Sequence, residues 1–245
     1  MATYVMSDIH GLQGRFTAML DHIHLQNDDT LFVLGDVIDR GPDGIALLKQ
    51  ILHHPQMILL MGNHEYMMLE YYEALGKLRA GRDLFHSMEC IHRWDHNHNK
   101  ETKSDFAAMP RGEQRALLDH LRELPLAYCD VKVKDRRFYL VHANWEPRLS
   151  KEILYLKDFV QNGMNPASLL WDRITEGDPL PPQRTLIFGH TITYFYHPSH
   201  PYQIWSGDCE LSKSKMIAID CGCAANREDS RLACIRLDDM EVFYV

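Results

Sequence analysis

Short apolar runs alternate with helical spacing over the first 65 residues of the chain. The runs at residues 3–6, 31–34 and 57–61 have the length of buried strands. Between the first two runs, apolar side chains recur at the i, i+3, i+4 and i+7 positions of one helix face, at Phe16, Met19, Leu20 and Ile23. A second helix is predicted over residues 44–53. The order β-α-β-α-β indicates a parallel sheet with right-handed crossovers.

The middle of the chain has little strand character. Residues 66–125 are rich in Met, Leu, Glu, Arg and His, and residues 113–124 place leucines at helical spacing. We therefore predict a helical insertion or cap over about 66–125. Within it, we interpret the polar segment around His92, His96 and His98 as a solvated loop, with an additional metal site as the alternative.

Strand patterns return near the end of this segment. Residues 128–133 and 137–141 flank a polar turn and predict a hairpin. A helix is predicted over residues 151–161 and a strand over residues 185–188. Four later apolar stretches are typical of a closing antiparallel meander, at residues 203–205, 215–219, 232–237 and 241–244.

Composition narrows the class of protein. The chain has 245 residues and 45% hydrophobic content, which suffices for a single domain over 1–245 with one substantial core. Its net charge of −8 argues against a dedicated nucleic-acid-binding protein, and it has no apolar run long enough to cross a bilayer. The first residues lack a secretory signal pattern. We interpret the six cysteines as reduced thiols of a cytoplasmic protein, with a redox pair at Cys221 and Cys223 as the alternative.

Polar side chains with ligand chemistry follow five of the predicted strands. The segments that carry them are residues 7–11, 35–41, 62–65, 142–144 and 189–191. Ligand sites in α/β sheets form at the carboxyl ends of strands, so we expect these side chains to meet there. A single strand-end Asp is more often a turn former or a helix cap, but that explanation must then hold for five loops at once.

The residue types in these loops favour metal binding. Asp, His and Asn are suitable ligands for first-row divalent metals such as Mn²⁺, Fe²⁺ or Zn²⁺. Asp8 and His10 are two residues apart, so both can reach one ion from an extended turn. A carboxylate such as Asp36 can bridge two ions about 3.5–4 Å apart, as phosphoesterase sites require.

The five segments resemble the motifs of the calcineurin-like metallophosphoesterase superfamily, and within it the small bacterial and phage Ser/Thr protein phosphatases. The family pattern is GDxHG, GDxVDRG, GNHE, a later His after a strand, and a final GH. The corresponding segments here are Ser7-Asp8-Ile9-His10-Gly11, Gly35-Asp36-Val37-Ile38-Asp39-Arg40-Gly41, Gly62-Asn63-His64-Glu65, Val141-His142 and Gly189-His190. Ser7 replaces the first Gly and Ile38 replaces a Val, and neither change removes a ligand.

The resemblance implies an α/β fold, a four-layer α/β/β/α metallophosphoesterase sandwich with a helical insertion. It also implies two divalent metal ions, with Mn²⁺ favoured and Fe²⁺ or Zn²⁺ as alternatives. The implied ligands are Asp8, His10, Asp36, Asn63, His142 and His190. By the same resemblance, His64 is a general acid paired with Asp39, and Arg40 binds substrate phosphate. Arg173, in Trp171-Asp172-Arg173, is the candidate for a second phosphate-binding arginine, with a surface salt bridge as the alternative.

Three functions follow from this resemblance. The favoured one is a metal-dependent phosphoric monoester hydrolase, a Ser/Thr protein phosphatase that uses a hydroxide activated by two metals on a phosphoprotein or a phosphorylated small molecule. The alternative is a nucleotide hydrolase resembling bacterial diadenosine tetraphosphatases, which typically read GNHD where this chain reads GNHE. A non-catalytic scaffold is less favoured because the ligand set and His64 are intact. No nucleic-acid or membrane partner is expected.

Overall fold

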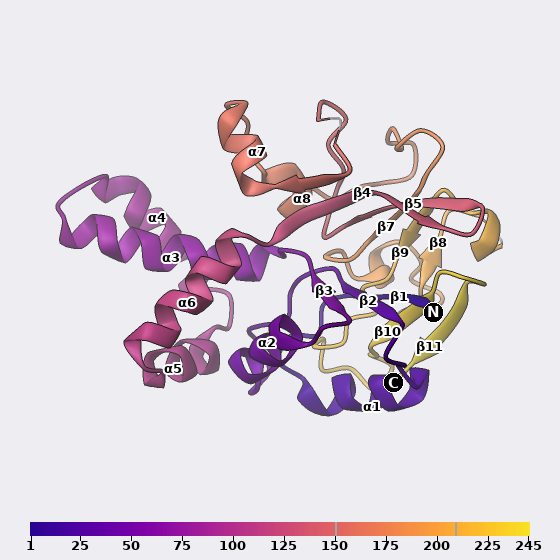
Figure 1. The fold of residues 1–245 in the computed structure, drawn as a ribbon, viewed down its shortest axis with the longest axis horizontal. Coiled ribbons are helices and arrows are strands. Elements are labelled where there is room, and N and C mark those ends of the chain that lie inside the picture. Colours follow the sequence, from indigo (N-terminus) through magenta and orange to yellow (C-terminus); the bar gives the residue numbers. More distant parts are fainter. Residues whose placement is uncertain (150, 209) are drawn as a thin grey trace.

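The computed structural model describes residues 1–149, 151–208 and 210–245. Two β-sheets pack face to face, with helices outside them (Figure 1). The first sheet has five strands in the order β11-β10-β1-β2-β3. These strands are β1 (Thr3–Met6), β2 (Thr30–Val33), β3 (Met57–Leu59), β10 (Ala233–Arg236) and β11 (Glu241–Tyr244).

The second sheet has six strands in the order β6-β4-β5-β7-β9-β8. These strands are β4 (Pro125–Val133), β5 (Arg136–Val141), β6 (Ile153–Tyr155), β7 (Thr185–Phe188), β8 (Trp205–Ser206) and β9 (Met216–Ala218). The predicted hairpin is confirmed, because β4 and β5 are antiparallel neighbours.

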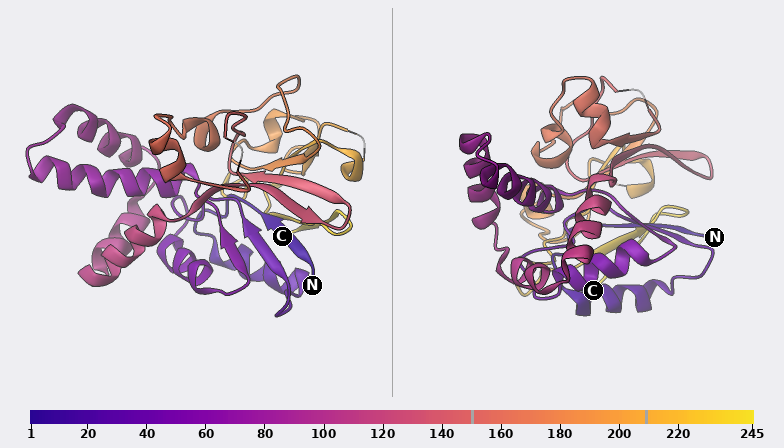
Figure 2. Two further views of the ribbon diagram at one scale, coloured as in Figure 1. Left: turned by 45° about the horizontal axis from the view of Figure 1, so that its top comes forward. Right: turned by 60° about the vertical axis from the view of Figure 1, so that its left-hand side comes forward.

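The helices form the outer layers. Helices α1 (Gln13–Ile23) and α2 (Gly44–His53) link the parallel strands β1, β2 and β3 and cover the outer face of their sheet (Figure 1). Four helices follow β3 and extend to one side of both sheets (Figure 2), namely α3 (Asn63–Arg79), α4 (Leu84–Asp95), α5 (Lys100–Ala108) and α6 (Arg111–Arg122). The far side of the second sheet carries α7 (Leu156–Gln161) and α8 (Ala167–Trp171). Short 3-10 turns occupy Thr193–Phe195 and Leu211–Lys213.

Alternation along the strands separates the two layers of the core. In β1, Val5 points between the sheets and clusters with Phe32 of the same sheet and Ile187 of the other. Its neighbour Met6 points outward and belongs to the cluster that contains Phe16 of α1. Successive strand residues face opposite sides, so one short strand contributes to both layers.

The antiparallel meander predicted for the last four strands is wrong. β8 and β9 join the second sheet, where β9 runs parallel to β7. β10 crosses to the first sheet and pairs antiparallel with β1, with β11 beside it. All residues of β9 and three of the four in β10 are buried. Their backbone groups need hydrogen-bond partners on both edges, and the two separate sheets supply them.

The helix predicted over residues 151–161 begins later than expected. Ile153–Tyr155 form β6, which pairs antiparallel with β4, and α7 starts only at Leu156. Asp158 Oδ2 accepts a hydrogen bond of 2.8 Å from Tyr155 N, a side-chain cap that begins the helix there. The β-branched and aromatic residues of β6 favour the strand.

Two further expectations concern membranes and thiols. Within the described ranges, no helix has both the length and the apolar character to cross a membrane. The described cysteines are buried free thiols, namely Cys90, Cys129, Cys221, Cys223 and Cys234. Burial raises the pKa of Cys223 to about 12, which disfavours the thiolate that a redox pair with Cys221 would need. Cys209 lies outside the described residues.

Candidate metal and phosphate site

The predicted metal ligands come from loops at the carboxyl ends of four strands and from the start of α3. His10 N donates a hydrogen bond of 2.9 Å to Asp36 O, which ties the loop after β1 to the loop after β2. Gly189 N donates one of 2.8 Å to His142 O, which ties the loop after β7 to the loop after β5. Strand order within each sheet therefore brings together residues that are far apart in the sequence.

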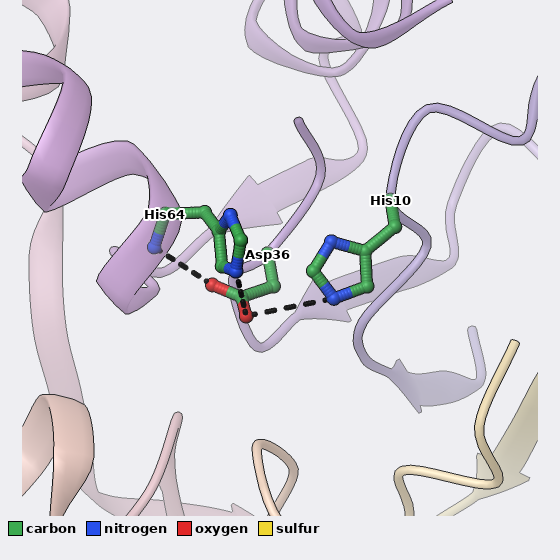
Figure 3. A group of neighbouring side chains, drawn as sticks. All are labelled: His10, Asp36 and His64. Carbon is green, nitrogen blue, oxygen red and sulfur yellow. Dashed lines mark hydrogen bonds and ion pairs between the residues drawn. The ribbon is translucent and has the colours of Figure 1, made fainter. Parts of the chain in front are cut away.

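Asp36 lies at the centre of the cluster and is almost completely buried. Its Oδ2 is 3.7 Å from His10 Nε2, and its Oδ1 is 3.5 Å from His142 Nε2. Figure 3 shows the carboxylate of Asp36 between the imidazole rings of His10 and His64. Asp36 thus faces histidines that follow strands of both sheets, as a residue that bridges two ions would.

Asn63 and Asp8 complete the cluster. Asn63 Oδ1 lies 2.9 Å from His142 Nε2 and 3.0 Å from His190 Nδ1. His190 N donates a hydrogen bond of 3.0 Å to Asp8 Oδ2. The structure therefore brings all the predicted ligands into one cluster, namely Asp8, His10, Asp36, Asn63, His142 and His190.

Several of these side chains sit on strained backbone. The φ angle is 53° at Asp8, 51° at His10, 52° at Asp36 and 61° at His190. For residues other than glycine this left-handed region costs roughly 1–2 kcal/mol each. Such strain persists only where the surrounding structure enforces it, and it concentrates at functional sites. Four strained residues in one cluster therefore support a functional role for it.

Glu65 holds the loop that presents Asp36. Its Oε1 accepts hydrogen bonds from Val37 N at 2.8 Å and from Ile38 N at 3.2 Å. Its Oε2 accepts from Asp36 N at 2.8 Å and from Gly62 N at 3.0 Å. With both oxygens used in this way, Glu65 positions the loop rather than offering itself as a ligand.

The electrostatics of the cluster fit divalent cations. Burial, followed by the charges of Asp220 and Asp36, raises the pKa of Asp8 well above its ordinary value. Burial lowers the pKa of His10, and it lowers that of His190 to about 3, so both rings are neutral and offer lone pairs at neutral pH. Mutually repelling carboxylates beside neutral imidazoles form a donor set that a first-row divalent cation would stabilise.

Asp220 is a buried carboxylate that the sequence interpretation missed. It follows β9, which lies next to β7, so it reaches the same edge of the second sheet. Its Oδ1 accepts a hydrogen bond of 2.9 Å from Gly222 N, and burial raises its pKa to about 6. The available signal was an Asp directly after a predicted strand, the same pattern that identified Asp8 and Asp36.

His64 and Asp39 form a buried pair beside the cluster. His64 Nδ1 is 2.7 Å from Asp39 Oδ2, and His64 Nε2 is 3.4 Å from Arg40 Nη2. Burial lowers the pKa of His64, but Asp36 and Asp39 together raise it above its ordinary value. A ring with one nitrogen on a carboxylate and the other beside a guanidinium is better suited to carrying a proton than to binding metal.

A cleft of about 380 Å³ opens beside His64. Both predicted phosphate-binding arginines, Arg40 and Arg173, lie in its wall. The guanidinium of Arg173 is 5.1 Å from the centre of the Phe195 ring. The other lining residues are Asn63, His64, Met67, Arg93, Asn97, Trp171, His190 and Ile192.

A family model described as calcineurin-like phosphoesterase matches residues 1–208. The chain belongs to this family. Its members are hydrolases, so this phosphoesterase is an enzyme by family. The family expected from the sequence motifs is therefore confirmed, and so is the α/β sandwich fold.

Two relatives in sequence carry the same name. This phosphoesterase is 27% identical over 150 residues to a symmetrical bis(5'-nucleosyl)-tetraphosphatase of Wigglesworthia glossinidia brevipalpis, and 24% identical over 150 residues to the protein of that name from Proteus mirabilis. Each match covers 60% of this chain and 46% of the relative. The chain thus spans about half the length of these relatives.

Solved structures share the fold at low identity. A protein serine/threonine phosphatase from Saccharomyces cerevisiae matches with a TM-score of 0.59 and 14% identity, covering 100% of this chain and 79% of that one. A metallophosphoesterase from Sphaerobacter thermophilus matches with a TM-score of 0.53 and 16% identity, covering 100% and 86%. These likenesses support the architecture of this phosphoesterase and do not distinguish its substrate.

One part of this phosphoesterase differs from the sequence prediction near the cleft. The solvated loop expected around His92, His96 and His98 is confirmed only in part: His92 lies on α4, which extends to Asp95, whereas His96 and His98 are exposed in the turn that follows. Trp94 is fully buried on that helix, and its Nε1 donates a hydrogen bond of 2.8 Å to Asp39 Oδ2. Because the neighbours of Trp94 in the sequence are polar, the sequence analysis did not recognise the end of a helix whose tryptophan packs beside the site.

Proposed function

We propose that this chain is a metal-dependent hydrolase that cleaves a dinucleoside polyphosphate. The observation that carries the proposal is the His64–Asp39 pair, which lies between a cluster of cation ligands and an arginine-lined cleft. The dinucleotide is favoured because the relatives in sequence carry the name bis(5'-nucleosyl)-tetraphosphatase.

The cluster has ligands for two divalent cations. Asp8, His10 and Asp36 would hold one, and Asn63, His142 and His190 would hold the other, with Asp36 shared between them. Mn²⁺ is our first choice, with Fe²⁺ or Zn²⁺ as alternatives. When bound, such cations neutralise phosphate charge and make a water molecule a strong nucleophile at neutral pH.

The residues of the chain supply binding and the proton. Arg40 and Arg173 would bind non-bridging phosphate oxygens with forked, permanently charged donors. Hydrolysis breaks the bond between phosphorus and the leaving oxygen, which then needs a proton. His64 would donate it from Nε2, while Asp39 at 2.7 Å from Nδ1 orients the ring and stabilises its protonated form. Water supplies the oxygen that the phosphate product gains.

A Ser/Thr protein phosphatase is the second candidate. The segment Gly62-Asn63-His64-Glu65 matches the protein phosphatase pattern at its last position, where diadenosine tetraphosphatases typically have Asp. Both candidates use the same cluster and the same His64, so they differ in the group attached to the phosphate. A non-catalytic scaffold is not supported, because the chain belongs to a family of hydrolases.

The test is hydrolysis by metal-stripped protein to which Mn²⁺, Fe²⁺ or Zn²⁺ is added back, with p-nitrophenyl phosphate, diadenosine tetraphosphate and a phosphoserine peptide as substrates. His64→Asn is expected to lower kcat at least ~100-fold, the scale of a lost general acid. His53→Asn, at an exposed position on α2, is the matched control and should leave kcat unchanged. Turnover of the peptide but not of the dinucleotide would replace the first candidate with the second. No turnover of any substrate with any of the three metals would overturn both.

A further inference from the structure

The cleft contains a third arginine that the proposed chemistry does not use. Arg93 belongs to α4, within the helical segment 63–122, whereas Arg40 follows β2 and Arg173 follows α8. All three side chains line the same cleft. Helix α4 therefore contributes to the wall of the site, although it lies outside every motif that identified the ligands.

Arg93 is held from two sides. Its Nη1 donates a hydrogen bond of 2.8 Å to Glu70 Oε2 on α3, and its guanidinium lies 5.6 Å from the centre of the Trp171 ring. Glu70 is only 17% exposed at its side chain, against 40% for Arg93. A guanidinium fixed by a carboxylate and an aromatic face loses little further freedom when it binds an anion.

The three arginines have different anchors. Arg40 is beside His64, Arg173 is over Phe195, and Arg93 is on Trp171. Their supports come from different elements, so each arginine has its own position in the wall of the cleft. A single phosphate group at His64 would engage the first of these positions directly, which leaves Arg93 for a group further along the substrate.

The charge of the lining points to an extended anion. Among the residues that line the cleft there are three arginines and no Asp or Glu, in a chain whose net charge is −8. Glu70, which does not line the cleft, accepts a hydrogen bond from Nη1 of Arg93. A guanidinium has five N–H donors in total. Donors therefore remain for a ligand in the cleft.

We infer that Arg93 binds a second phosphate group of the substrate and so selects compounds with linked phosphates over simple monoesters. This inference rests on the proposed hydrolase function and names the residue that sets its substrate class. The competing explanation is that the Arg93–Glu70 ion pair only fastens α4 to α3.

The chain offers a matched control for that explanation. Arg122 of α6 forms an ion pair of 2.9 Å with Glu73 of α3, and its side chain has the same 40% exposure as Arg93. Arg122 does not line the cleft. Arg122→Gln therefore removes a helix-to-helix ion pair, together with a pair to Asp119 of the same helix, without touching the site.

The experiment measures inhibition of p-nitrophenyl phosphate hydrolysis by inorganic tripolyphosphate and by orthophosphate, with Mn²⁺ in excess over phosphate. Arg93→Gln is expected to raise the inhibition constant of tripolyphosphate at least ~10-fold, about the loss of one charge-assisted contact. The constant for orthophosphate should rise much less, so the ratio of the two constants changes. Arg93→Lys keeps the positive charge but lacks the paired N–H donors of a guanidinium. Its inhibition constant for tripolyphosphate should therefore lie between those of wild type and Arg93→Gln.

The outcomes separate the inference from the function on which it rests. The role of Arg93 would be overturned if Arg93→Gln raised the inhibition constants of tripolyphosphate and orthophosphate equally. It would also be overturned if Arg122→Gln changed the ratio of these constants as much as Arg93→Gln does. Neither result would contradict the hydrolase function. Absence of hydrolysis of both p-nitrophenyl phosphate and diadenosine tetraphosphate in the wild-type protein would instead count against the proposed function. Calorimetric titration of the metal-loaded variants with tripolyphosphate gives a second readout that does not depend on turnover.

Discussion

The indole Nε1 of Trp94 donates a hydrogen bond of 2.8 Å to Oδ2 of Asp39. The same oxygen contacts His64 Nδ1 at 2.7 Å, while Asp39 Oδ1 has no hydrogen-bond partner in the described part of the chain. Trp94 is fully buried, so its ring is fixed by packing. The orientation of the carboxylate behind His64 therefore depends on a tryptophan from the helical segment 63–122.

Trp94→Phe is expected to lower kcat about 10-fold with little change in KM, because a hydrogen bond to a charged group is worth about 1.5–3 kcal/mol. The phenyl ring keeps most of the packing and removes the N–H donor. Steady-state kinetics with p-nitrophenyl phosphate measure the effect. Trp145→Phe is the control, since the Trp145 indole donates a comparable bond of 2.7 Å to Pro179 O outside the His64 pair. An equal loss of kcat in both variants would contradict the role of Trp94.

The cluster of ligands at the strand ends was predictable because each ligand is marked by the residues next to it in the sequence. Each ligand follows a short apolar run, and parallel strands direct their carboxyl ends to one edge, so Asp8 and Asp36 could be placed together without coordinates. The glycines and motif order then identified His142 and His190 in the second sheet. Asp220 had the same local signal, but it was missed because β9 was assigned to a meander rather than to a position beside β7.

The cleft was less predictable because its walls depend on tertiary packing. Arg93 reaches the site only because α4 packs along α3, and neither helix carries a spacing pattern that specifies that docking. Trp94 is surrounded in the sequence by charged and polar residues, so burial of its ring could not be read from periodicity. Side-chain partners between helices follow from packing geometry, which a single sequence does not encode in a short motif.

Glu65→Gln is expected to lower the free energy of unfolding by about 3 kcal/mol, because an amide can accept fewer of the four backbone N–H bonds and its NH₂ group would face donors. Urea denaturation of the metal-free protein measures this change. The affinity for Mn²⁺ should fall as well, since Glu65 supports the loop that presents Asp36. Glu113→Gln is the control: its exposed ion pair with Lys49 should contribute less than about 0.5 kcal/mol. If Glu65→Gln lost no more stability than about 0.5 kcal/mol, the proposed role of Glu65 in holding the Asp36 loop would be contradicted.

Gly62→Ala should prevent formation of the site, since a Cβ at Gly62 would overlap the backbone N and the Oδ1 of Asp36. We expect a loss of at least about 3 kcal/mol in stability, as for other severe steric conflicts in packed regions. Gly14→Ala is the matched control, because a Cβ there meets nothing within 4 Å on helix α1. That change should raise stability by about 0.5–1 kcal/mol through helix propensity. The stability of both variants is measured by thermal denaturation, and their metal affinity by Mn²⁺ titration. A Gly62→Ala variant that is stable and binds Mn²⁺ would show that the loops containing Gly62 and Asp36 can move apart.

The buried carboxylate of Asp220 predicts a pH-dependent stability of the metal-free protein. Burial raises its pKa from 3.8 to about 6, so the folded state resists ionisation that the unfolded state undergoes freely. Near pH 3 or below, the group is almost fully protonated in both states and costs almost nothing. As the pH rises from about 3 to 6, the unfolded state ionises first and stability falls, and above pH 7 the loss is constant at on the order of 3 kcal/mol.

Asp220→Asn removes that ionisation, so the variant should match wild type near pH 3 and be more stable by on the order of 3 kcal/mol at pH 7.5 in EDTA. The difference between the two proteins reports the ionisation of Asp220 together with its effect on Asp8, whose pKa the charge of Asp220 raises. Asp21→Asn, at an exposed position on α1, should show no such divergence. Mn²⁺ should shrink the difference at pH 7.5, since a bound cation offsets the repulsion among Asp8, Asp36 and Asp220. Equal stability of variant and wild type at pH 7.5 without metal would mean that Asp220 ionises without cost, and that repulsion within the carboxylate cluster does not favour cation binding.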